Sequence, residues 1–85
     1  MKINNKYLKD LRSTLLPTLF SYVAPDLDIE IIVDSKTRSL LVKGFCRTNR
    51  KSLGFAVTKQ SISDGSYKPR FRGQVEDLVG LLRAK

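Results

Sequence analysis

The chain has 85 residues, enough for one small domain with a single modest core. Sixteen Lys and Arg against eight Asp and Glu give a net charge of +8, which attracts polyanions or acidic protein partners. Histidine is absent, and the sequence has neither a G-x-G-x-x-G nor a Walker motif. This inventory argues against an enzyme, a metal site and a nucleotide cofactor.

Cysteine usage and hydropathy predict a cytoplasmic protein without a membrane span. The single cysteine, Cys46, cannot form an internal disulfide. The apolar runs are shorter than the roughly 20 residues of a membrane span, and the N-terminus lacks the apolar core of a signal peptide. Cys46 falls on the apolar face of a predicted strand, which indicates a buried structural thiol rather than a nucleophile.

Residues 4–23 predict an amphipathic helix. Asn4 or Asn5 can cap its start, while Pro17 predicts a kink or a restart near Leu16. The apolar positions recur at helical spacing, and they are Tyr7, Leu8, Leu11, Leu15, Leu19 and Val23.

Residues 27–34 and 39–47 predict a β-hairpin. The first segment, "LDIEIIVD", alternates with a period of two, and "SKTR" at 35–38 forms the loop. The paired residue numbers then add to 73, so that Glu30 lies opposite Lys43 as an opposite-charge pair.

A third strand follows a second loop, "TNRK", at residues 48–51. With this loop the paired numbers add to 99, which places Phe45 across from Gly54 and Phe55 across from Gly44. Each ring would then cover the glycine of the neighbouring strand. The face expected to lie under a helix comprises Leu27, Ile29, Ile31, Val33, Leu40, Val42, Cys46, Leu53, Phe55 and Val57.

The segment from residue 60 to residue 72 leaves two alternatives. Asp64-Gly65 is a two-residue turn signal, so residues 60–63 extend the third strand and residues 66–71 return as a short fourth strand, confined to an edge by Pro69. The other alternative is a basic loop. Residues 73–85 predict a final helix that buries Val75, Leu78, Val79 and Leu82. The expected class is α+β, with an antiparallel three- or four-stranded meander flanked by an N-terminal and a C-terminal helix.

Cations interleaved with aromatic residues predict nucleic-acid binding, to DNA or RNA, with little base specificity. Lysines and arginines can contact phosphates, and exposed rings can stack on bases for about 1–3 kcal/mol per base. Arg70 and Arg72 precede the predicted last helix, where a bound phosphate would offset their unfavourable place at the positive end of the helix dipole. The candidate residues are Lys43, Phe45, Arg47, Arg50, Lys51, Tyr67, Lys68, Arg70, Phe71 and Arg72.

Packing roles are the alternative for the rings. Phe45 would pack on Gly54 and under a helix or a second subunit, and Tyr67 and Phe71 would form a small core beneath the edge strand. A protein-interaction module is accordingly the second hypothesis for function. It would be a small inhibitor, adaptor or assembly subunit of the kind that phages and mobile elements encode, binding an acidic protein or a second copy. Its interface would be an apolar patch with a basic rim, formed by Ile32, Leu41, Phe45 and Ile62.

The order of helix, three strands and helix, with lysines and arginines just before the final helix, resembles the layout of double-stranded-RNA-binding domains. The resemblance is one of topology. Those domains have a small-residue segment and then a lysine cluster inside their second helix. The corresponding stretch here is "YKPRFRGQVEDLVG", whose first helical turn holds Glu76 and Asp77. This departure argues against duplex RNA, and the sequence does not assign the chain to that family.

Overall fold

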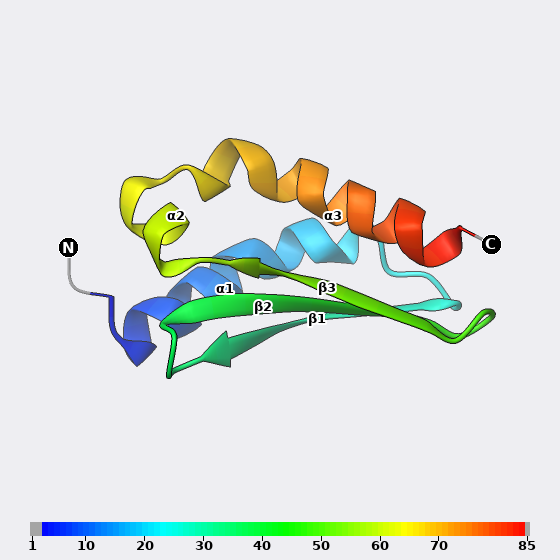
Figure 1. Cartoon of the computed structure of the whole chain (residues 1–85), viewed down its shortest axis with the longest axis horizontal. Coiled ribbons are helices and arrows are strands. Elements are labelled where there is room, and N and C mark those ends of the chain that lie inside the picture. Colours follow the sequence, from blue (N-terminus) through cyan, green and yellow to red (C-terminus); the bar gives the residue numbers. More distant parts are fainter. Residues whose placement is uncertain (1–2, 85) are drawn as a thin grey trace.

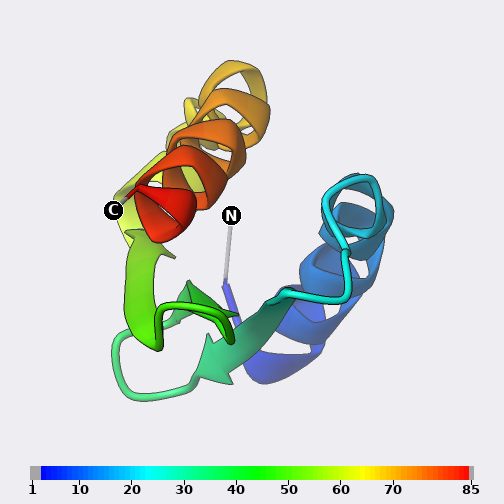
Figure 2. The same cartoon turned by 90° about the vertical axis from the view of Figure 1, so that its right-hand side faces the viewer.

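The computed structural model describes residues 3–84, which form an α+β fold of two layers (Figure 1). The three strands make an antiparallel meander in the order β1-β2-β3, and α1 and α3 lie on the same side of this sheet (Figure 2). The predicted class, with an N-terminal helix, a three-stranded meander and a C-terminal helix, is confirmed. The elements are α1 (Asn5–Phe20), β1 (Leu27–Asp34), β2 (Ser39–Cys46), β3 (Lys51–Val57), α2 (Lys59–Asp64) and α3 (Tyr67–Arg83).

Helix α1 begins with the predicted asparagine cap. The Asn4 side-chain oxygen accepts from the Tyr7 N–H at 2.9 Å, which satisfies one of the free donors of the first turn. The buried stripe consists of Leu8, Leu11, Leu15 and Leu19. The predicted restart near Leu16 does not occur, because Pro17 lies in the last turn and α1 continues as one helix to Phe20.

The register of the first hairpin is the predicted one, with Leu27 opposite Cys46 and Glu30 opposite Lys43. The predicted register of the second hairpin is wrong by two residues. Phe55 lies opposite Val42, and Phe45 lies opposite Ser52, because the loop spans residues 47–50 and not 48–51. Arg50 closes this loop in the left-handed region at φ 58°, and the Asn49 side chain accepts from the Lys51 N–H at 2.9 Å. A shift of two keeps every side chain on its predicted face.

Close approach explains the two glycines that the predicted register had placed beneath phenylalanine rings. A Cβ on Gly44 would lie 2.5 Å from Cδ1 of Leu82, so the glycine lets α3 approach β2 closely. A Cβ on Gly54 would lie 2.7 Å from the carbonyl oxygen of Val42 on the neighbouring strand. The interpretation of each glycine as a seat for an aromatic ring is therefore wrong.

Residues 59–64 form α2 and residues 67–72 begin α3, so neither the predicted fourth strand nor the basic loop is present. Thr58 caps α2 by accepting from the Ser61 N–H at 3.1 Å, and Gly65 ends this helix with a φ of 77°. The Asp64-Gly65 pair is thus a helix stop rather than a hairpin turn. Pro69 is the third residue of α3, a position where the missing N–H costs nothing because it would have no partner within the helix.

One hydrophobic core fills the space between the sheet and the two long helices. Helix α3 contributes Tyr67, Phe71, Val75, Leu78, Val79 and Leu82, so the predicted apolar residues of its second half are buried as expected. The rings of Phe55 and Phe71 meet edge to face with centroids 6.1 Å apart. Of the predicted core face of the sheet only Leu53 is exposed, and Ile29, Val33 and Phe55 are half-buried. Residue 85, the last of the predicted C-terminal helix, lies outside the described residues.

The other face of the sheet has no helix over it (Figure 1). Asp28, Glu30, Lys43 and Phe45 are exposed there. None of the helices between residues 3 and 84 has the length and apolar character needed to cross a membrane.

Candidate nucleic-acid interface

Cationic side chains gather at the end of the molecule where α1 begins. The loop between β1 and β2, helix α2 and the first turns of α3 lie at this same end (Figure 1). The register explains why, since Asp34 pairs with Ser39 and Leu40 pairs with Val57, which brings the 35–38 loop next to Lys59. We call this group the basic end, and its members, all exposed, are Lys6, Lys9, Lys36, Arg38, Lys59, Lys68, Arg70 and Arg72.

Two carboxylates near the basic end are bound to the backbone, whereas Asp10 in α1 is exposed beside Lys9. Asp34 accepts from the N–H groups of Lys36 and Thr37, and the hydrogen bonding by Thr37 holds its pKa below the ordinary value. Asp64 accepts from the Ser66 N–H at 2.9 Å, which lowers the pKa of this carboxyl as well. Both groups therefore stay ionised at neutral pH while their oxygens serve local turns.

Ion pairing at the basic end is sparse. Within residues 3–84 the one salt bridge there joins Arg72 to Glu76, one turn later in α3, at 3.7 Å. The Arg72 side chain is 76% exposed, so this pair contributes little to stability. The other seven cations of the basic end have no carboxylate within salt-bridge distance among the described residues.

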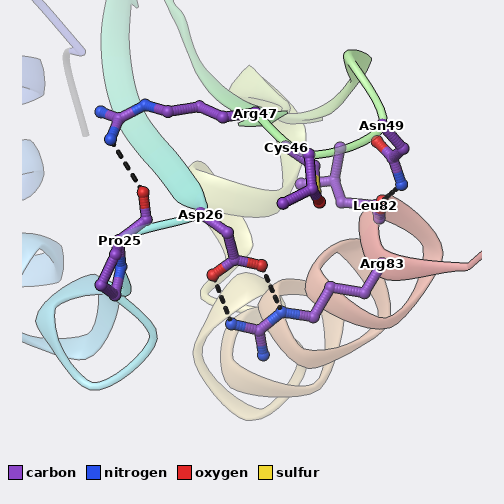
Figure 3. Close-up of polar contacts among 8 residues, drawn as sticks. Pro25, Asp26, Cys46, Arg47, Asn49, Leu82 and Arg83 are labelled. Atoms are coloured by element: carbon purple, nitrogen blue, oxygen red, sulfur yellow. Dashed lines mark hydrogen bonds and ion pairs between the residues drawn. The ribbon is translucent and has the colours of Figure 1, made fainter.

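Cations at the opposite end of the molecule have partners within the chain. Arg47 donates to both oxygens of Asp28, at 2.5 and 3.0 Å, and to the Pro25 carbonyl at 2.8 Å. Arg83 donates to both oxygens of Asp26, at 3.1 and 3.2 Å, which lowers the pKa of that carboxyl (Figure 3). These contacts join the start of β1 to the β2–β3 loop and to the end of α3.

The end of α3 receives two further donors, Asn49 of this loop and Lys51 at the start of β3. Lys51 Nζ donates to the carbonyls of Leu81 and Ala84 at 3.1 and 2.7 Å, and Asn49 Nδ2 donates to the Leu82 carbonyl at 2.7 Å (Figure 3). The Leu82 and Ala84 carbonyls lie past the reach of any later N–H of the helix, and the Leu81 carbonyl also accepts from the Ala84 N–H at 3.3 Å. Arg47 and Lys51, predicted as phosphate contacts, thus have structural partners, whereas the predicted contact Arg50 is exposed and makes no hydrogen bond or ion pair within residues 3–84.

Lys43 and Phe45, also predicted, lie in the middle of the uncovered sheet face. The Phe45 residue is 38% exposed and borders a hollow of about 480 Å³. Asp28, Glu30 and Lys43 line the same hollow. Because Asp28 pairs with Arg47 and Glu30 lies opposite Lys43, the hollow has no excess positive charge to attract a phosphate. The predicted apolar patch on this face is reduced, because Ile62 is buried in the core on the helix side.

The structure also changes the second predicted group. Tyr67 and Phe71 are 8% and 3% exposed and belong to the core, so they are removed from the candidate stacking rings. Burial raises the pKa of Tyr67. Lys68, Arg70 and Arg72 are exposed, but they lie inside α3 and not before it. The argument that a phosphate completes the start of the last helix beside Arg70 and Arg72 therefore does not hold.

The sequence reasoning missed five members of the basic end, namely Lys6, Lys9, Lys36, Arg38 and Lys59. A meander with short loops places alternate loops at opposite ends of a sheet, so the grouping of the 35–38 loop with the end of the third strand was already present in the predicted topology. The start of α3 joins this group because residues 59–66 fold as a helix and a cap.

Cys46 is buried, and its sulfur lies 3.2 Å from the hydroxyl oxygen of Thr48. That hydrogen bond lowers the pKa of the thiol. Across residues 3–84, no three Cys, Asp or Glu side chains are grouped so that they could hold a metal ion.

No protein-family model, curated protein or solved structure matches this chain.

Proposed function

We propose that the protein binds nucleic acid through the basic end, by contacts to phosphates and with little base specificity. One observation carries this proposal, namely the contrast between the two ends of the molecule. Arg47, Lys51 and Arg83 bind carboxylates or carbonyls of the chain itself. The cations of the basic end are exposed, and Arg72 alone among them pairs with a carboxylate within residues 3–84. Their charge is available to an external polyanion.

The chemistry of the basic end supports binding through the backbone of the nucleic acid. Tyr67 and Phe71, the rings predicted for stacking, are in the core, so phosphate contacts carry the proposal. Such contacts are shared by all sequences and by DNA and RNA. We place this binding in the cytoplasm, as expected from the single cysteine.

A matched pair of charge reversals tests the site. Arg70→Glu and Arg50→Glu change the net charge equally, and Arg70 lies at the basic end whereas Arg50 lies in the loop at the other end. Fluorescence anisotropy with labelled single- and double-stranded oligonucleotides of DNA and RNA measures affinity as a function of salt. We expect Arg70→Glu to weaken binding to every sequence alike and to reduce the salt slope by about 0.7–0.9 for each phosphate that the variant no longer neutralises.

Arg50→Glu should leave affinity close to that of the parent protein. Absence of any binding by the parent protein at low salt would refute the proposal. Equal losses of affinity for the two variants would show that the net charge of the protein, and not the basic end, determines binding. Circular dichroism establishes that each variant is folded.

A further inference from the structure

The outer edge of β3 has no partner strand within residues 3–84. In antiparallel sheets the residues alternate between those whose N–H and C=O point to the neighbouring strand and those whose groups point away. Arg12 Nε donates to the Ile31 carbonyl at 2.8 Å, so the backbone groups of Ile31 point away from β2. Val42 lies opposite Ile31, so its backbone groups point to β3 and bond those of Phe55. The residues of β3 whose N–H and C=O point away from β2 are therefore Ser52, Gly54 and Ala56.

The two edges of the sheet differ in how they are protected. At the β1 edge the Arg12 side chain donates a hydrogen bond to the outward-pointing carbonyl of Ile31, and Asp28 and Glu30 place charges on the same strand. On β3 the residues after Lys51 are all uncharged, and its outward residues have small or no side chains. Charged side chains are a common way in which proteins prevent another strand from adding to an edge. The β3 edge is thus open to pairing.

An apolar surface accompanies this edge on the side of α3. Leu53 and Leu81 are 38% and 59% exposed. Together with Phe55 and Leu78 they line a groove of about 230 Å³ between β3 and α3. Asp77 also lines the groove, and within residues 3–84 it makes no ion pair. The groove therefore offers an apolar surface and a carboxylate side by side.

We propose that a second copy of this chain pairs with the β3 edge, β3 against β3 in antiparallel orientation, with the two-fold axis at Leu53. In this register Ser52 of one copy pairs with Gly54 of the other, so outward N–H groups meet outward C=O groups. Leu53 faces Leu53 across the axis, next to both Leu81 side chains. The result is a continuous six-stranded sheet.

The spacing of residues along β3 and α3 and their charges favour a second copy of this chain as the partner of the β3 edge. Because α3 runs antiparallel to β3, Leu81 lies beside Leu53, and Asp77 lies one turn earlier, about 6 Å along the helix. Residues i and i+2 of a strand are separated by about 6.6 Å and share a face. Lys51 and Leu53 have this spacing, which is close to the distance between Asp77 and Leu81 along α3. When the two strands pair in antiparallel orientation, the order of the first two residues matches that of the second two. In the dimer Lys51 of each copy lies beside Asp77 of the other, and each Leu53 lies beside a Leu81.

A register centred on Phe55 is disfavoured by the same reasoning. It would place the two Asp77 side chains opposite each other near the axis, with no cation between them. The axis at Leu53 removes that repulsion and forms two opposite-charge pairs instead.

Molar mass in solution tests the dimer. Light scattering and sedimentation equilibrium are measured from about 10 µM to about 1 mM, a range that detects weak interfaces. We expect the mass to rise from 9.6 kDa towards twice that value. Leu53→Asp should keep the protein monomeric, whereas Val23→Asp, which replaces an apolar residue that is 59% exposed and outside this edge, should not. A monomer at every concentration, or dimer loss in Phe45→Asp but not in Leu53→Asp, overturns the proposal.

A charge swap tests the register. Lys51→Asp and Asp77→Lys should each raise the dissociation constant of the dimer by about tenfold, and the double variant should restore most of the affinity. Independent, additive losses of affinity would refute the pairing of these two residues. Because Lys51 also binds carbonyls of α3, thermal unfolding of each variant is recorded. Ser52→Pro is the second variant, since it removes an outward N–H without touching the ladder to β2, and it should also weaken the dimer.

Discussion

Replacing Gly44 by alanine perturbs the contact between α3 and β2. The added Cβ would lie 2.5 Å from Cδ1 of Leu82 and 3.4 Å from Cδ2 of Leu78. Leu82 is 0% exposed, so its side chain cannot turn into solvent to relieve the overlap. Overpacking of this kind costs about 1–3 kcal/mol, and the loss of glycine entropy in the unfolded chain returns about 0.4–1 kcal/mol. We expect Gly44→Ala to lower the free energy of unfolding by about 1–2 kcal/mol.

Urea unfolding followed by circular dichroism measures this change, with a fall in Tm of about 4–8 °C for each kcal/mol. Gly73→Ala is the matched control, because a Cβ on Gly73 meets nothing within 4 Å and the residue lies inside α3. That variant should gain about 0.5–1 kcal/mol from its better helix propensity. A Gly44→Ala protein as stable as the parent protein would refute the close approach of α3.

Three further changes probe the turns and the ion pair at the end of α3. Gly65→Ala should lower the free energy of unfolding in urea by about 1 kcal/mol, because the φ of 77° that ends α2 is strained for any residue with a Cβ. Arg50→Gly should gain about 0.5 kcal/mol in the same assay, since it relieves a left-handed arginine at φ 58° at the cost of greater unfolded-state entropy. Arg83→Gln should be destabilised near neutral pH. The pKa of Asp26 is below 3.8 in the folded protein, so the stability that the pair contributes is present above this pH and is lost as the pH falls through the lowered pKa. The difference between Arg83→Gln and the parent protein in pH-dependent unfolding should therefore shrink below about pH 4.

The first hairpin was predictable because its pattern and its charges agree. Alternation indicated the buried face, the loop at 35–38 gave the register, and the match of Glu30 with Lys43 agreed with it. The second hairpin lacks such a pair, and its register depends on which residue takes the left-handed conformation in the loop. That residue is Arg50, a type that gives no local signal for a positive φ.

The segment after β3 shows a different difficulty. Asp64-Gly65 fits a hairpin turn and a helix end equally well in local terms. The distinguishing signal was the spacing of Tyr67, Phe71 and Val75, which recur every four residues and are all buried on one side of α3. Pro69 obscured it, although proline is tolerated in the first turn of a helix.

Composition indicated the basic character of the protein but not where its charge is available. Arg47 and Lys68 are both exposed cations within two residues of an aromatic residue, and only the fold shows that Arg47 binds Asp28. Partners 19 residues away, as in this pair, cannot be read from local spacing.

The placement of α1 and α3 has a mechanical consequence. Helix α1 packs over β1 and α3 over β3, and the two helices diverge above the sheet (Figure 2). A hydrogen bond of 2.8 Å from the Tyr22 hydroxyl to the Glu76 carboxylate links the segment just after α1 to α3. The lysines at the start of α1 and the cations at the start of α3 are therefore held apart by the curvature of the strands between them. If nucleic acid binds at the basic end as proposed, the twist of the sheet would set the distance between these two groups of cations, and so which phosphates of one ligand both groups can contact.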